Sequence, residues 1–284
     1  MSKVLVLFLK FLSICPFMLL RVVAIKLYYF NAYIFKYRYD VVDSNLKLAF
    51  PKKSEIVIKQ IRKFFFKHFF NLIMEIIKML TASKSFINNR VTITNPELID
   101  NFAKDNQTII IVFGHFNNWE WIGQKLSIIA KQKVVGIYKP LNNKVFNELL
   151  KTARTKFGAI AVSMEESMRY ILKTKDDCQI IGIIADQNPV VNETTKWLSF
   201  FKKEVPVFMG AERIAKKMNY PVVFCDMQKI SNGKYNITFE VLEGTPKNTT
   251  ESEITKCYFE RLEQQIKANP SQWLWSHRRW KHKR

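Results

Sequence analysis

A histidine and a glutamate follow a strongly apolar run at residues 108–113, in the order Gly114, His115 and, five residues later, Glu120. The run predicts a buried strand, and Gly114 permits a tight exit from it. His115 is then expected on a loop at the sheet edge, with Glu120 about one turn into the next helix. A carboxylate there can accept a hydrogen bond from one imidazole nitrogen, so that the other nitrogen acts as a base on a substrate hydroxyl. The alternative is a structural histidine beside a carboxylate.

The elements that must position these residues are short apolar runs that alternate with helical stretches. Runs of Val and Ile flanked by helices indicate a mostly parallel sheet covered on both faces, in one α/β domain. Gly233 lies between the last two strands and predicts an antiparallel hairpin at one edge of the sheet. The predicted strands are residues 108–113, 133–138, 159–163, 179–184, 221–227 and 235–242. The predicted helices are residues 54–80, 118–130, 143–157, 165–174, 210–218 and 251–268.

Composition and charge limit the class of protein. The chain has 284 residues, 48% hydrophobic and 14% aromatic, which excludes a disordered tail. Its mean hydropathy of −0.10 is too low for a polytopic membrane protein. The net charge of +21 indicates an anionic partner, which can be nucleic acid, phospholipid, a phosphorylated sugar or an acidic carrier protein.

Cysteine and histidine usage predicts no metal site. The four cysteines form no C-x-x-C pair, and four histidines without an H-E-x-x-H motif offer few ligands. We therefore expect buried thiols in a reducing cytosol, with no zinc site, no disulfide framework and no cofactor.

The apolar segment at residues 4–35 indicates membrane attachment. Lys10, Pro16, Arg21 and Lys26 interrupt it, and an aromatic cluster ends it. A cleaved signal peptide is disfavoured because no small-residue cleavage site follows the apolar run. A spanning helix and an in-plane anchor both remain, and the in-plane anchor better explains the interrupting cations. We expect residues 1–35 to form a membrane-anchoring helical segment and residues 36–284 a domain on the cytoplasmic side.

Four ordered blocks carry a family resemblance. The sequence from His115 to Glu120 resembles the H-x4-(D/E) signature of the lysophospholipid acyltransferase superfamily, and more specifically of its late acyltransferases of lipid A biosynthesis. Residues 138–143 with Arg154, residues 185–187, and residues 273–281 with their W-x-H-R-R-W-K ending are similar to that branch in the same order. The resemblance covers the whole chain, and it implies a glycerolipid acyltransferase-like α/β fold.

The resemblance also implies roles for the matching residues. His115 would be the general base, with Glu120 as its orienting partner, and the activated acceptor oxygen would attack an acyl thioester. Asp186 would support the site from the neighbouring strand. The alternative for Asp186 is a cap on a turn at a strand end.

Three further residues are implied in substrate binding. Arg154 would hold a phosphate or the developing oxyanion, although the helix macrodipole alone can favour a cation at that position. Lys139 stands where the family has arginine, which keeps the charge but loses the bidentate fork. Asn142 completes the same block. Residues 200–213 differ from the family's Thr-rich segment, so acyl length and acceptor do not transfer.

The implied reaction moves a fatty acyl chain from acyl carrier protein to a hydroxyl of a lipid A precursor at the inner membrane. The implied partners are that carrier, the acceptor lipid and an anionic membrane surface, which the basic residues 278–284 also suit, and no nucleic acid. Two alternatives stay open. One is an acyltransferase for a lysophospholipid or another envelope lipid, and the other is a non-enzymatic basic protein that binds membrane or nucleic acid. The tryptophans Trp273, Trp275 and Trp280 are expected to serve in packing.

Overall fold

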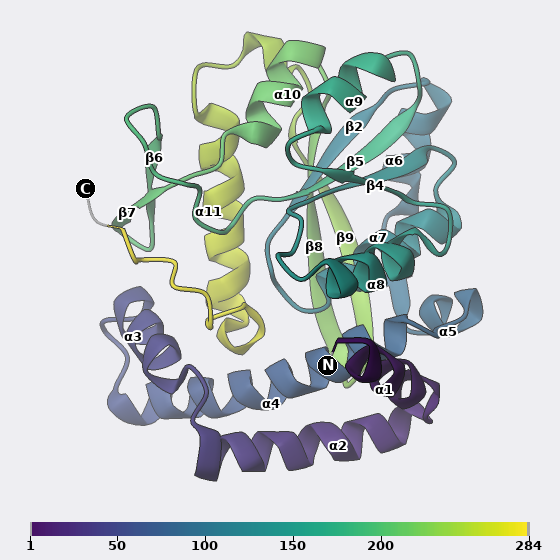
Figure 1. Cartoon of the computed structure of the whole chain (residues 1–284). Helices are drawn as coiled ribbons and strands as arrows, with labels where there is room; N and C mark the ends of the chain where they lie inside the picture. Colours follow the sequence, from purple (N-terminus) through teal and green to yellow (C-terminus); the bar gives the residue numbers. More distant parts are fainter. Residues whose placement is uncertain (1, 283–284) are drawn as a thin grey trace.

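The strands of the computed structural model, which describes residues 2–282, form one large sheet and one small hairpin (Figure 1). They are β1 (Val91–Ile93), β2 (Ile109–Phe113), β3 (Lys133–Tyr138), β4 (Ile160–Ser163), β5 (Gln179–Ile184), β6 (Trp197–Phe200), β7 (Lys203–Pro206), β8 (Val222–Ser231) and β9 (Lys234–Glu243). The large sheet has seven strands in the order β1-β9-β8-β2-β5-β3-β4. All neighbours are parallel except β8 and β9, so the expected mostly parallel α/β fold is confirmed.

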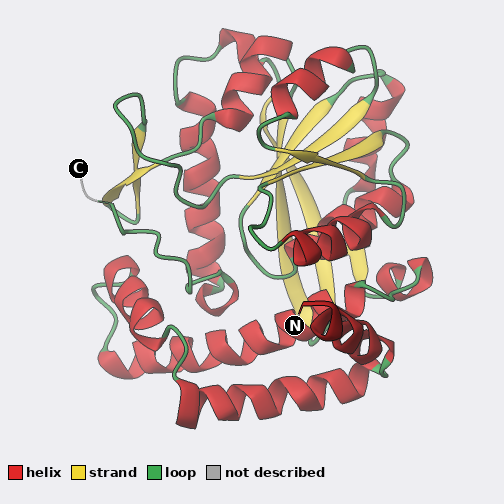
Figure 2. Ribbon diagram, in the orientation of Figure 1, coloured by secondary structure: helices red, strands yellow, loops and turns green. Residues whose placement is uncertain are grey.

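Helices cover both faces of this sheet, as Figure 2 shows. They are α5 (Lys84–Asn88), α6 (Pro96–Lys104), α7 (Trp119–Ile129), α8 (Lys144–Thr155), α9 (Ser167–Lys173), α10 (Gly210–Met218) and α11 (Glu253–Ala268), with short turns η2 (Pro246–Asn248) and η3 (Pro270–Gln272). Successive strand side chains point to opposite faces. Ile110 therefore packs in a core with α9, α10 and α11, whereas Ile111 packs in a second core with α5, α6, α7 and α8.

The predicted elements recur with small shifts at their ends. The strands at residues 133–138 and 179–184 and the helix at residues 210–218 have the expected bounds. Asn118 caps α7 by accepting a hydrogen bond from the amide of Trp121 at 3.2 Å, and Asn143 caps α8 in the same way. These side chains satisfy backbone N–H groups that have no partner within the helix.

The position of the β8–β9 hairpin was predicted wrongly. The pair is antiparallel as expected, but β9 is not an edge strand, because β1 pairs with it in parallel. β1 has three residues and therefore shows no alternating pattern to detect. The β6–β7 hairpin at the side of the molecule was also not predicted, because the four residues of β7, Lys-Glu-Val-Pro, form no apolar run.

The N-terminal helices lie across one end of the domain (Figure 1). They are α1 (Ser2–Ile14), α2 (Phe17–Phe30) with the π-turn η1 (Asn31–Phe35), α3 (Tyr39–Ala49) and α4 (Glu55–Met79). The segment Phe17–Phe35 is long and apolar enough to cross a membrane by length and composition. One stripe of it is nevertheless buried on α4, with Leu20 at 0% and Ala24 at 1% exposure.

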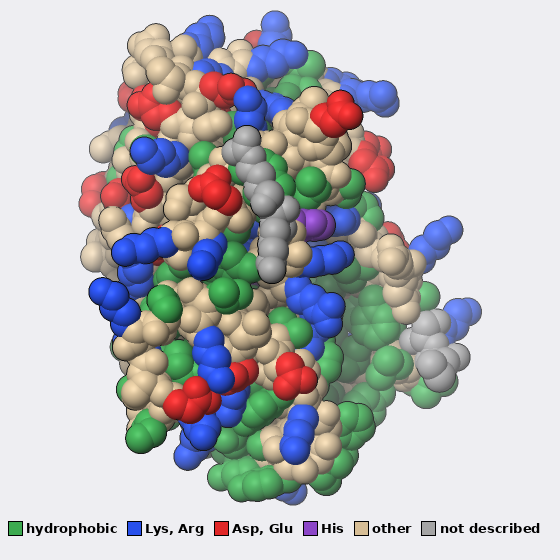
Figure 3. Space-filling view, turned by 90° about the vertical axis from the view of Figure 1, so that its left-hand side faces the viewer, with side chains coloured by type: hydrophobic (Ala, Val, Ile, Leu, Met, Phe, Trp, Pro, Cys, Tyr) green, Lys and Arg blue, Asp and Glu red, His purple; other side chains and the backbone are tan. Residues whose placement is uncertain are grey.

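The opposite side of these helices is exposed and apolar. Exposed hydrophobic residues of α1, α2 and η1 include Leu7, Phe11, Met18, Val22 and Tyr33. Figure 3 shows hydrophobic side chains gathered at the lower end of the molecule, the end where Figure 1 places α2. That residues 1–35 form a membrane-anchoring segment separate from the domain stays a prediction.

Candidate active site

The strand register brings His115 and Asp186 together. β2 and β5 are parallel neighbours with Phe113 paired to Ile184, and each candidate residue follows its strand end by two positions. Because the carboxyl ends of parallel strands share one edge, both side chains emerge there. Gly114 allows this approach, since a Cβ at that position would lie 2.7 Å from Cδ1 of Leu262 and 3.1 Å from Oδ2 of Asp186.

Asp186 is a buried carboxylate that accepts three hydrogen bonds. It is 1% exposed, and its Oδ1 lies 2.6 Å from Nδ1 of His115. Its Oδ2 accepts from the amide of His115 and from the indole Nε1 of Trp273, each at 2.7 Å. Burial by itself raises the pKa of Asp186, but the charge that His115 carries when it is protonated and these donors together hold that pKa below its ordinary value. Asp186 is therefore an anion at neutral pH.

The second ring nitrogen of His115 lies outside the contact with Asp186. An ionised Asp186 holds the proton on Nδ1, which leaves Nε2 as the acceptor. Nε2 lies 3.3 Å from the side-chain amide nitrogen of Gln187, and the imidazole packs against the ring of Trp119 at 4.8 Å. The side chain of His115 is 18% exposed. A substrate hydroxyl that replaces the Gln187 amide would meet a lone pair already oriented for proton transfer.

Glu120 does not orient His115, which corrects the expectation from sequence spacing. Its carboxylate binds Arg154 through two hydrogen bonds, from Nε at 2.8 Å and from Nη2 at 2.6 Å. Asn117 has a positive φ of 53° and turns the chain before α7, so that the first turn of α7 directs Glu120 towards α8. Burial lowers the pKa of Arg154, but its bonds with Glu120 outweigh burial and raise that pKa. Arg154 also lies over the ring of Tyr138, at 5.8 Å.

Trp273 was expected only to pack, but it also contacts the site. The side chain is 2% exposed, and its indole N–H reaches Asp186. Its segment pairs with the His115 loop, because Leu274 donates to the carbonyl of His115 at 3.0 Å and Asn117 donates to the carbonyl of Gln272 at 2.9 Å. Tryptophan carries a single N–H donor that needs a partner when buried, which is the signal that the sequence offered.

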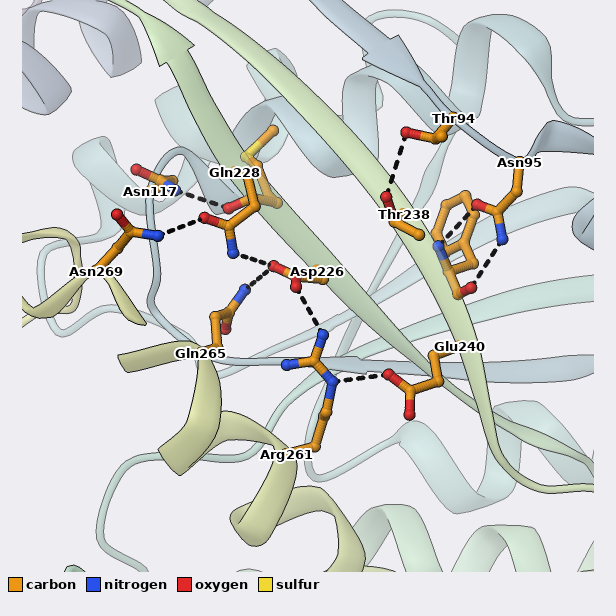
Figure 4. Close-up of polar contacts among 12 residues, drawn as sticks. Thr94, Asn95, Asn117, Asp226, Gln228, Thr238, Glu240, Arg261, Gln265 and Asn269 are labelled. Carbon is orange, nitrogen blue, oxygen red and sulfur yellow. Dashed lines mark hydrogen bonds and ion pairs between the residues drawn. The ribbon is translucent and has the colours of Figure 1, made fainter. Parts of the chain in front are cut away.

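A polar network fixes the other side of the loop. Figure 4 shows Asp226 of β8 accepting from Arg261 at 2.7 Å and from Gln265 at 2.6 Å, which ties α11 to the sheet. The side-chain nitrogen Nδ2 of Asn117 donates to the carbonyl of Met227 on the same strand at 2.7 Å. The loop that carries His115 is thus held by β8 as well as by the segment around Trp273.

A cationic pocket adjoins the chain segment that follows Asp186. We call it the cation pocket and define it by Arg38, Lys139, Arg278 and Lys281, which share its wall with Asn188, His277 and other residues. No carboxylate is among its described lining residues. Figure 3 shows a histidine side chain among Lys and Arg side chains on this face.

The wall of the cation pocket is connected to the His115–Asp186 pair through the chain and through hydrogen bonds. The residue after Gln187 is Asn188, whose amide donates to Nε2 of His277 at 3.3 Å. Burial is the main cause that lowers the pKa of His277 to about 4, so this ring is neutral at pH 7 and can accept that bond. Arg38 donates to the carbonyl of Ser276 at 2.8 Å.

The six residues selected from the sequence thus fall into separate groups. His115 and Asp186 form one pair, Glu120 and Arg154 form another, and Lys139 lies in the cation pocket. Asn142 is exposed in the turn before α8. Sequence reasoning missed Arg38, which lies far from every motif in the chain. Within residues 2–282, no group of three His, Cys, Asp or Glu side chains is placed to hold a metal ion.

The chain matches the model of a known protein family. The model of a family described as bacterial lipid A biosynthesis acyltransferase matches residues 3–282, which is essentially the whole chain. No curated protein matches the chain.

Proposed function

The chain belongs to the bacterial lipid A biosynthesis acyltransferase family, and from this premise we propose that it moves a fatty acyl chain from acyl carrier protein to a hydroxyl of a lipid A precursor. Because this is a family of acyltransferases, the chain is an enzyme that transfers acyl groups. The observation that carries the residue assignment is the 2.6 Å contact between Nδ1 of His115 and the buried Asp186, which leaves Nε2 next to the side-chain amide of Gln187.

The proposed reaction starts when Nε2 of His115 takes the proton of the acceptor hydroxyl. The acceptor oxygen attacks the thioester carbonyl carbon, and the tetrahedral intermediate then expels the thiolate, which takes the proton from the imidazolium. Asp186 stabilises the imidazolium while it exists. Arg154 keeps Nη1 outside its two bonds with Glu120, and this nitrogen is our candidate donor to the developing oxyanion.

We assign the phosphorylated headgroup of the acceptor to the cation pocket. Guanidinium and ammonium groups form strong charge-assisted hydrogen bonds with phosphate oxygens, and the described lining carries no competing carboxylate. Arg38 lies just beyond the exposed aromatic residues Tyr33 and Phe35. A lipid with its chains at that apolar surface can therefore place its phosphate in the pocket and its hydroxyl near His115.

Removing two cations from this pocket should weaken acceptor binding. In the double variant Arg278→Gln/Lys281→Gln, we expect the KM for a phosphorylated acceptor to rise roughly 30-fold, because two charge-assisted bonds are lost, while kcat changes little. Steady-state kinetics with saturating acyl donor measures both. Lys217→Gln/Lys234→Gln removes the same charge from exposed positions outside the pocket and should leave KM within about twofold. An equal rise in both double variants would refute the assignment.

We also propose that the protein lies on the cytoplasmic side of the inner membrane, with α1 and α2 in the plane of the interface. The buried stripe of α2 on α4 and its exposed apolar side suit an in-plane helix. The basic surface attracts anionic lipids and an acidic carrier protein alike.

The acceptor is tested by the lipids of a strain that lacks this chain. Mass spectrometry should show lipid A lighter by one acyl group, and expression of the wild-type chain should restore the mass. Unchanged lipid A together with accumulation of a lysophospholipid would replace the proposed acceptor by the second candidate.

A further inference from the structure

A second pocket has a cationic lining, and neither His115 nor Asp186 is among its lining residues. It is enclosed by α2, α4 and the turn between β8 and β9, and it has a volume of about 410 Å³. We call it the α2–α4 pocket and define it by Arg21, Lys67, His68 and Lys229. It opens along the N-terminal helices and shares none of the residues of the cation pocket.

Two cations of this pocket, Arg21 and Lys229, repel each other. No described carboxylate lies within ion-pair distance of Arg21, Lys67 or Lys229. Burial lowers the pKa of Lys229, the buried Glu75 raises it, and the charge of Arg21 lowers it further. Three cations around one partly buried space favour an anion there, since like charges cost more where water is excluded.

A buried histidine in the wall of the pocket also favours a polar ligand there. His68 is 6% exposed, and neither of its ring nitrogens has a hydrogen-bond partner among the described residues. Burial, with a contribution from Lys229, lowers the pKa of His68 to about 3, so it adds no charge at neutral pH. A buried ring with two unsatisfied nitrogens is unfavourable in an otherwise packed interior.

The other side of the pocket is apolar and faces outward. Ile25 is 51% exposed, Tyr29 49% and Phe64 56%. These residues continue the exposed apolar side of α2. A ligand that fills the pocket therefore meets cations at one end and apolar side chains at the other, which is the polarity of a phospholipid.

We propose that the α2–α4 pocket binds the phosphate headgroup of an anionic phospholipid from the bilayer on which α1 and α2 lie. The phosphate contacts Arg21, Lys67 and Lys229, and the acyl chains leave along Ile25 and Tyr29. None of its lining residues is one that we assign to acyl transfer. It rests on the proposed in-plane orientation only for the source of the lipid.

The test is native mass spectrometry of the detergent-solubilised chain after mixing with phosphatidylglycerol or phosphatidylcholine. We expect the wild type to retain one phosphatidylglycerol and to prefer it at least tenfold over phosphatidylcholine. Arg21→Gln/Lys229→Gln should lose that preference. Lys10→Gln/Lys26→Gln removes the same charge from exposed positions of α1 and α2 outside the pocket, and it should keep the preference.

Further measurements keep the result interpretable. The thermal midpoint of each double variant shows whether it has folded. If Arg21→Gln/Lys229→Gln does not fold, Lys67→Gln alone replaces it as the test and should weaken retention. A photoreactive phosphatidylglycerol should label the segment of α4 around His68. Equal retention by the pocket and control variants, or displacement by an equimolar lipid A precursor, would overturn the phospholipid assignment. Retention is measured without turnover, so it is judged separately from acyl transfer.

Discussion

Replacing Asp186 with Asn is expected to lower kcat for acyl transfer by roughly 10³- to 10⁴-fold, close to the loss expected for His115→Ala. An asparagine has the same shape, but it cannot act as an anion beside Nδ1. The imidazole then loses the proton arrangement that exposes the Nε2 lone pair, and the imidazolium loses its counter-charge. The two losses should be similar and should not add in the double variant, because the two residues act as a unit.

The measurement is kcat and KM with purified protein, acyl carrier protein as donor and a lipid A precursor as acceptor. Circular dichroism and thermal unfolding of Asp186→Asn identify a fold defect. Trp273→Phe is the matched variant, because it removes one donor to Asp186 while keeping an aromatic ring, and it should cost far less than Asp186→Asn. If Asp186→Asn keeps kcat within tenfold while His115→Ala abolishes it, Asp186 does not support the base.

Breaking the Glu120–Arg154 pair from one side should destabilise the fold by about 2–4 kcal/mol. The side chain of Glu120 is only 8% exposed, so Arg154→Met leaves a buried carboxylate without its counter-charge. The value is expected near the lower end of that range, because the side chain of Arg154 is 32% exposed and water screens part of the interaction. Denaturant unfolding in detergent measures the free energy.

A double-mutant cycle decides whether the two side chains act together. Glu120→Gln/Arg154→Met removes both charges and should be more stable than Arg154→Met alone, with a coupling energy of about 1–3 kcal/mol. Simple addition of the two single effects would show that the pair does not contribute as a unit. The cycle reports on stability and remains informative whatever the single variants do to kcat.

Much of the sheet could be predicted from local patterns, because a buried parallel strand is a continuous run of Val and Ile. The strands at residues 133–138 and 179–184 show this. Such patterns cannot report which strands become neighbours. Sequence spacing therefore selected Glu120 as the partner of His115, whereas the register of β2 and β5 places Asp186 there.

Other parts of the site depend on contacts between residues that are distant in the chain. Arg38 and Lys139 are distant in the chain but line one pocket, and no periodicity in the sequence indicates that they meet. Trp273 shows a different limit. Its burial was predictable from its size, but its hydrogen bond with Asp186 requires the segment after α11 to pair with the His115 loop.

The pairing of the segment after α11 with the His115 loop can form only late in synthesis, because this segment lies near the end of the sequence. α1 and α2 leave the ribosome before β2 and β5, the strands that carry His115 and Asp186. The segment from Gln272 to Arg278 leaves after both strands. On the proposed membrane orientation, the chain meets the bilayer while the carboxylate of Asp186 still lacks its indole donor and the cation pocket lacks one wall. The nascent chain therefore reaches lipid before its candidate site is complete.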